Sequence, residues 1–198
     1  MKRLILSAIL LITFSLNAQS DAENLLNKLR EKFDNINDLV VNFSQFAGSQ
    51  SLSGKLYYSD KDKLRVELGN TVLISDGITN WNYNKSENKV IISASNQSDG
   101  SAISLKTLLY DYPERCSLKS ETDSGQEVLL LIPEDGSLNF RSARLWVNDQ
   151  NLIDKVLLED NFGNSTSIKF GGYLMNTGIK DYIFTFQKPE GCTVIDLR

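Results

Sequence analysis

Apolar and polar residues alternate along most of the chain, and this period of two predicts β-strands. In the stretch LVVNFSQF, Leu39, Val41 and Phe43 fall on one face, whereas Asn42 and Ser44 fall on the other. KLRVEL, TVLIS, NKVIIS, QEVLLLI, SARLWVN, STSIKFGG and DYIFTF continue the pattern, separated by short turn signals rich in Asn, Asp and Gly. The spacing predicts a meander of about eleven antiparallel strands in one domain over residues 19–198.

Two segments have helical spacing instead. Residues 21–36 follow a capping box at Ser20 and form an amphipathic helix. Leu105, Leu108 and Leu109 share one face of a second, short helix that Pro113 ends. A sheet of so many strands curls and either closes or needs cover, so these helices are expected to cover its open side. The second helix is either a movable lid or a permanent plug, and the enclosed space is either a ligand cavity or a filled core.

The first residues are typical of a secretory signal peptide. Lys2 and Arg3 precede a short apolar run, and Ala18 provides a small residue for cleavage, so residues 1–18 are predicted to be removed. No cysteine stands near the expected cut, which argues against a lipid anchor, and no second apolar run is long enough to span a membrane. We therefore expect an exported, soluble protein.

Charge and composition narrow the function. The net charge is −4 and the chain contains no histidine. Binding of nucleic acid is disfavoured because clustered cations are missing, and His-based catalysis is excluded. No nucleophile elbow, phosphate loop or CxxC motif is present, so we expect neither an enzyme, a cofactor nor a metal site, although a hydrolase built from Asp and Glu alone stays a minor alternative. Cys116 and Cys192 either form one disulfide or remain as two buried thiols.

Several stretches resemble, in their order along the chain, the LolA family of outer-membrane lipoprotein carrier proteins. The residues that carry the resemblance are Phe43, Gln45, Gly54, Leu56, Ser75, Asp76, Gly77, Trp81, Tyr83, Phe184, Phe186, Pro189, Gly191, Val194, Ile195 and Asp196. The resemblance implies a mainly β fold, an unclosed antiparallel β-barrel covered by short α-helices, with a hydrophobic cavity for acyl chains. It also implies a periplasmic, monomeric carrier that takes acylated lipoproteins from an inner-membrane ABC transporter to an outer-membrane acceptor.

A lipid- or lipoprotein-sensing envelope-stress domain on the same fold is the alternative function. It would require a signalling partner, and because no regulatory segment follows the last strand in the sequence, we expect carriage instead.

Alternation and side-chain size predict the acyl-chain cavity. Its wall is expected to contain Phe43, Leu64, Val66, Leu68, Trp81, Tyr83, Trp146, Phe170 and Phe184. Leu105, Leu108 and Leu109 are the expected lid. Asp60-Lys61 stands where the family has an Arg-Pro pair that helps to hold the lid closed, so that latch does not carry over; Asp60 is either part of a rewired latch or an ordinary turn residue. Arg65, predicted by alternation to face solvent, either contacts a partner or lies on a plain solvated face.

Overall fold

The computed structural model describes residues 21–59, 62–95 and 105–198, so the predicted signal peptide, Ser20 and Asp60-Lys61 lie outside the described residues. A helix covers residues 21–34 and a helical turn covers residues 105–106. The strands are β1 (Asp38–Ala47), β2 (Gln50–Ser59), β3 (Lys63–Leu68), β4 (Thr71–Ser75), β5 (Thr79–Asn84), β6 (Lys89–Ala94), β7 (Cys116–Asp123), β8 (Gln126–Pro133), β9 (Ser142–Val147), β10 (Ile153–Glu159), β11 (Ser165–Met175) and β12 (Thr193–Asp196). The short helical segments are the π-helix η1 (Thr107–Asp111) and the 3₁₀ helices η2 (Pro113–Arg115) and η3 (Asp181–Phe184).

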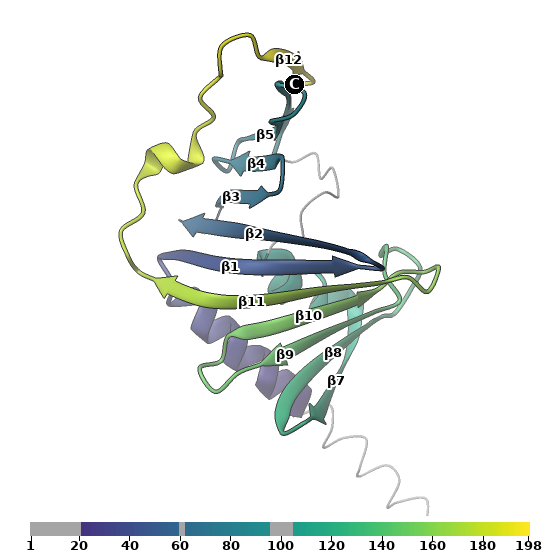
Figure 1. Ribbon diagram of the computed structural model, residues 1–198. Coiled ribbons are helices and arrows are strands. Elements are labelled where there is room, and N and C mark those ends of the chain that lie inside the picture. The colour runs from purple at the N-terminus through teal and green to yellow at the C-terminus, as the bar shows by residue number, and fades with distance from the viewer. Residues whose placement is uncertain (1–20, 60–61, 96–104) are drawn as a thin grey trace, which may run out of the picture. The chain divides into compact units, whose positions relative to one another are not determined.

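The described strands form one open sheet in the order β12-β6-β5-β4-β3-β2-β1-β11-β10-β9-β8-β7 (Figure 1). The predicted mainly β, unclosed architecture is confirmed. The sheet has twelve strands rather than about eleven, and β12 pairs parallel with β6, so it is not purely antiparallel. The hairpins also form two runs, β1–β6 and β7–β11, because the chain leaves the sheet after β6 and β11 returns beside β1.

The contacts divide the chain into two compact units. The first combines the described residues up to Phe33 with Leu105–Ser167, and the second combines those of Asp34–Ser104 with Ile168–Arg198. β11 belongs to both units, since Ser167 and Ile168 are consecutive residues within it.

The first unit is a helix against a sheet of four hairpin-connected strands. The buried side of the N-terminal helix consists of Ala22, Leu25, Leu26, Leu29 and Phe33, as its periodicity predicted. Lys28 Nζ lies 3.6 Å from Glu127 Oε2, which places the helix on the face of β8 that also carries Leu129. Each leucine buried there contributes about 1.5–3 kcal/mol to folding.

The second unit contains β1–β6, most of β11, and the C-terminal segment with η3 and β12. Asp38 fixes the chain after β11, because its carboxylate accepts hydrogen bonds from the amides of Thr177 and Gly178, both at 2.8 Å. The alternating stretch DYIFTF, predicted as a strand, instead contains η3. Both edges of β3 are already paired, by β2 and β4, so a segment crossing the sheet there packs on its face and closes its own turns.

Candidate functional site

The pairing of β1–β4 aligns the apolar residues of successive strands on one side of the second unit. Val41 is opposite Leu56, Leu56 is opposite Val66, and Val66 is opposite Leu73. Residues paired across antiparallel strands point to the same side of the sheet. The apolar residues of this surface, called here the Phe43 face, together with Tyr58, are Leu39, Val41, Phe43, Leu52, Leu56, Leu64, Val66, Leu68 and Leu73; Gln45, Thr71 and Ser75 share the same side.

The Phe43 face is apolar but incompletely covered. Leu39, Val41 and Phe43 are buried, whereas Leu64, Leu68 and Leu73 are only half-buried and Leu52 keeps 45% of its surface exposed. Phe170 of β11 adds a further aromatic ring, whose centroid is 6.3 Å from that of Phe43. The arrangement leaves apolar surface available, which a filled core would not.

The Phe43 face becomes more polar at β5. Asn82 is paired with Leu73 on one side and with Ile91 on the other, so an amide stands in an otherwise apolar row. Among the described residues the Asn82 side chain has no hydrogen-bond partner. Its donors and acceptor are therefore free to contact water or a bound molecule.

Of the predicted cavity residues, the structure brings Phe43, Leu64, Val66, Leu68 and Phe170 together on the Phe43 face. The other four predicted residues lie elsewhere; they are Trp81, Tyr83, Trp146 and Phe184.

Trp81 and Tyr83 lie on the opposite side of the sheet, which corrects their grouping with Phe43. Trp81 is paired with Ile74 and Ile74 with Arg65, so both aromatic residues share the side of Arg65, called here the Arg65 face. The Arg65 face of the described strands includes Val40, Tyr57, Lys63, Arg65, Glu67, Val72, Ile74, Trp81, Tyr83, Val90 and Ile92.

Phe184 and Trp146 also leave the predicted group. Phe184 is only 1% exposed, but it belongs to η3 and not to a strand. Trp146 lies in the first unit, on the face of the sheet opposite to Leu129. The Lys155 ammonium sits 3.8 Å above its ring, and its indole N–H donates to Asp123 at 2.8 Å. Those polar contacts hold the Trp146 ring in place on a side that the N-terminal helix does not cover.

Arg65 does not point freely into solvent as alternation predicted. Its Nε donates to Glu67 Oε1 at 2.8 Å, and its Nη1 donates to the carbonyl of Ile183 in η3 at 3.2 Å. Lys63 on the same face contacts Asp181 at 2.9 Å. The prediction failed because alternation gives the side of a residue but not what covers that side; here η3 covers it.

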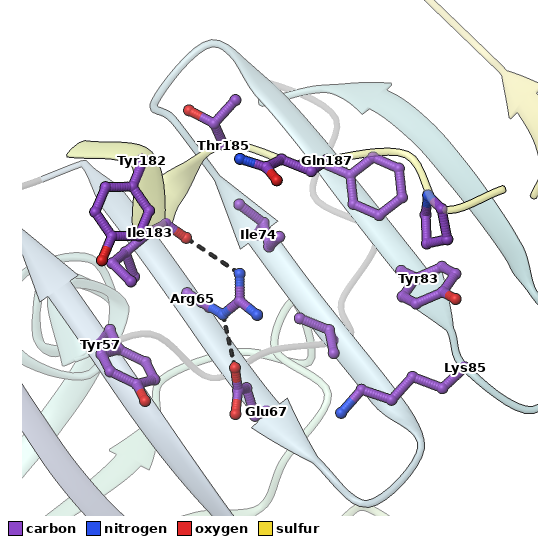
Figure 2. A pocket seen from close by; sticks show the side chains of 13 residues that line it. Tyr57, Arg65, Glu67, Ile74, Tyr83, Lys85, Tyr182, Ile183, Thr185 and Gln187 are labelled. Atoms are coloured by element: carbon purple, nitrogen blue, oxygen red, sulfur yellow. Dashed lines mark hydrogen bonds and ion pairs between the residues drawn. The ribbon is translucent and has the colours of Figure 1, made fainter. Parts of the chain in front are cut away.

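A pocket of about 400 Å³ lies between the Arg65 face and the C-terminal segment (Figure 2). Val72 and Ile74, both buried, form its apolar floor, and Tyr57 and Tyr83 stand on its two sides. The C-terminal segment contributes Tyr182, Ile183, Thr185, Phe186, Gln187 and Pro189, and the sheet adds Arg65, Glu67 and Lys85. Sequence reasoning missed this pocket, although the uninterrupted run Val72-Leu73-Ile74 already indicated a strand covered on both sides.

The predicted lid residues are buried in the first unit. Leu105, Leu108 and Leu109 are 9%, 1% and 2% exposed, and the helical segment ends before Pro113 as expected. Arg30 of the N-terminal helix donates to the Leu109 carbonyl at 2.7 Å and lies over the Tyr110 ring at 5.2 Å. The two helical elements are thus held together by Arg30; whether they act as a lid stays a prediction.

Cys116 and Cys192 are both buried free thiols, the second of the two alternatives that the sequence left open. Burial raises the pKa of Cys116 to about 11, which keeps that thiol protonated and unreactive. Among the described residues no group of three or more His, Cys, Asp and Glu side chains is arranged to hold a metal ion. None of the helices in the described ranges combines the length and apolar character needed to cross a membrane.

Comparison with known proteins gives a consistent picture. The profile of the family described as outer membrane lipoprotein carrier protein LolA matches residues 34–187. An outer-membrane lipoprotein carrier protein of Azotobacter vinelandii is 27% identical over 203 residues, covering 97% of this chain and 96% of the relative. An outer-membrane lipoprotein carrier protein of Neisseria meningitidis serogroup C is 30% identical over 128 residues. That match covers 62% of this chain and spans only 60% of the relative's length.

Solved structures show the same fold. An uncharacterized conserved protein of Thermus thermophilus superposes with a TM-score of 0.60 at 12% identity, over 89% of this chain and 99% of that one. MucB superposes with a TM-score of 0.53 at 17% identity, over 89% of this chain and 66% of MucB. The family match covers most of the described residues, including the Phe43 face and all of the pocket lining except Pro189, and the chain belongs to the outer membrane lipoprotein carrier protein LolA family.

Proposed function

We propose that this protein is a periplasmic carrier that holds the acyl chains of lipoproteins against its Phe43 face. The observation that supports this is the continuous apolar surface across β1–β4, on which Leu64, Leu68 and Leu73 stay partly exposed. A carrier needs such a surface because each methylene costs about 0.8 kcal/mol to expose to water. A chain of roughly fifteen methylenes would therefore cost on the order of 12 kcal/mol, which forbids free diffusion across an aqueous compartment.

The carrier must also release its cargo. Asn82, between Leu73 and Ile91 near one end of the apolar row, makes the surface less favourable for acyl chains than pure hydrocarbon, which supports release. The N-terminal helix and the segment of Leu105, Leu108 and Leu109 are the proposed lid, coupled by Arg30. Favourable closure of such a lid after the cargo has left offsets part of the cost of losing the cargo.

The direct experiment incubates the exported protein with spheroplasts of its source bacterium, whose inner-membrane ABC transporter supplies acylated lipoproteins. We expect lipoproteins to appear in the supernatant in a one-to-one complex with the protein, and to pass from it to outer-membrane fractions that contain an acceptor. Leu68→Gln should lower the released amount about fivefold, since roughly 1 kcal/mol of apolar contact is lost. Ile78→Gln, in the exposed turn between β4 and β5, is the matched control and should release normally.

A sensor of lipids or lipoproteins would give a different result. It would bind a fluorescent fatty acid, and Leu68→Gln would weaken that binding, but no lipoprotein would leave the spheroplasts. That outcome would rule out carriage while leaving the Phe43 face as the lipid site.

A further inference from the structure

The pocket on the Arg65 face is separate from the proposed acyl surface, because the two lie on opposite sides of the same strands. Its volume of about 400 Å³ is sufficient for one large side chain with its flanking backbone. The floor of Val72 and Ile74 and the rings of Tyr57, Tyr83 and Phe186 favour an aromatic occupant, since aromatic rings gain edge and face contacts from such walls.

The charges around the pocket favour an anion. Arg65 and Glu67 pair with each other at 2.8 Å, so they leave little net charge. Lys85 lines the pocket, is exposed, and has no carboxylate within ion-pair distance among the described residues. Lys85 is therefore the one lining cation, among the described residues, that no carboxylate neutralises, on a chain whose net charge is −4.

The backbone beside the pocket favours a peptide over a small molecule. Residues 186–188 follow η3 without entering a helix or strand. Within the described part of the chain, no backbone hydrogen bond engages the amide or carbonyl groups of Phe186, Gln187 or Lys188. An extended peptide can pair with such a segment while its side chains enter the neighbouring pocket, as in strand addition.

We infer that this pocket docks an extended acidic peptide segment of a partner protein, with an aromatic side chain on the Val72 and Ile74 floor. Carboxylates beside the aromatic residue face Lys85, and the peptide backbone pairs with residues 186–188. The protein then has two independent binding surfaces, one on each side of the sheet, and a bound peptide leaves the Phe43 face open.

The test is fluorescence anisotropy with the exported protein and a fluorescein-labelled peptide, Gly-Asp-Phe-Asp-Gly. We expect saturable binding that is lost when Phe is replaced by Ala in the peptide and when both Asp residues are replaced by Lys. Lys85→Glu should weaken binding about tenfold, because the attraction between Lys85 and the peptide carboxylates becomes a repulsion of similar size. Lys119→Glu, an exposed lysine of β7, makes the same charge change away from the pocket and should leave binding unchanged.

A fluorescent fatty acid provides the second measurement. Its affinity should be equal in the Lys85→Glu variant and the unaltered protein, which shows that the variant is folded and that the two surfaces are independent. No saturable binding of the peptide, equal affinity for its Lys-containing form, or equal losses in the Lys85 and Lys119 variants would overturn the inference. None of these results would count against the proposed carriage of lipoproteins, because that function depends on the Phe43 face.

Discussion

The ring of Phe43 in β1 lies across the backbone of Gly54, its partner in β2. A Cβ built on Gly54 would be only 2.5 Å from Cζ of Phe43 and would also collide with the carbonyl oxygen of Glu67. Glycine is therefore the residue that lets this aromatic side chain lie flat on the sheet. This close approach explains why a glycine, Gly54, stands opposite Phe43, and it sets the position of the ring on the Phe43 face.

Gly54→Ala should displace the Phe43 ring and destabilise the protein. We expect the free energy of unfolding in urea to fall by about 1–3 kcal/mol, the usual cost of overpacking, and the affinity for a fluorescent fatty acid to fall with it. Gly136→Ala is the matched control, because nothing lies within 4 Å of a Cβ at that position. Equal stability of the two variants would show that the Phe43 ring has room to move aside at no cost.

Much of the fold could be predicted from the sequence because alternation depends only on neighbouring residues. The strands from LVVNFSQF to STSIKFGG and the buried side of the N-terminal helix were found in this way. Alternation does not show which face of one strand aligns with which face of the next. Alternation and side-chain size predict that Trp81 and Tyr83 belong to the cavity wall, yet the pairing of Ile74 with Trp81 puts both on the Arg65 face.

The C-terminal segment is the second region whose structure could not be predicted from alternation. DYIFTF alternates as a strand does, but no free edge of β3 is available for it to pair with, so it contains a 3₁₀ turn instead. The long-range contacts of Arg65 with Ile183 and of Lys63 with Asp181 follow from that turn, and no local pattern encodes them.

Arg65→Met should loosen the C-terminal segment. Arg65 is a quarter exposed and links Glu67 to the Ile183 carbonyl, so its loss should cost about 1–2 kcal/mol of unfolding free energy. Limited proteolysis should then cleave within residues 176–190 sooner than in the unaltered protein. Arg144→Met removes a more exposed pair with Glu121 at 3.5 Å and should change neither quantity measurably. Cleavage at the same rate in both variants would mean that η3 is held by its other contacts.

Asp38 should make the stability of the second unit dependent on pH at the acid end. Burial alone would raise its pKa, but the hydrogen bonds from Gly178 and Thr177 outweigh this and hold the pKa below its usual value of 3.8. Such a carboxylate stabilises the folded state fully above pH 3.8, and the contribution disappears as the pH falls through the lowered pKa.

Asp38→Asn is the corresponding variant. It should lower the unfolding free energy by about 1–3 kcal/mol at pH 7, because the amide cannot accept all the hydrogen bonds that the carboxylate accepts. Urea unfolding from pH 7 to pH 2 should show the two proteins converging below pH 3.8, since the other carboxyl groups titrate alike in both. A difference that stays constant over this range would show that the charge of Asp38 contributes nothing.

Arg30→Met should uncouple the proposed lid segment from the N-terminal helix. The Arg30 side chain makes both a hydrogen bond to Leu109 and a contact with the Tyr110 ring, so its loss should cost about 1.4 kcal/mol of local stability. Amide hydrogen exchange in residues 105–111 should then accelerate about tenfold. Lys28→Met, which breaks an exposed ion pair on the same helix, should leave exchange in that segment unchanged. Equal exchange in both variants would mean that Leu105, Leu108 and Leu109 hold the segment without Arg30.

Asn82→Leu should convert the proposed carrier into one that retains its cargo. The substitution replaces the single amide between Leu73 and Ile91 with an apolar side chain, which extends the Phe43 face without a change in register. A gain of about 1 kcal/mol in contact with acyl chains would slow release of a fluorescent fatty acid roughly fivefold. Transfer of lipoproteins to outer-membrane fractions should slow by a similar factor, while their release from spheroplasts stays normal. Asn139→Leu, an exposed asparagine of the first unit, is the matched control. Unchanged release from the Asn82 variant would show that acyl chains do not extend as far as β5, and the bound cargo would then be confined to β1–β4.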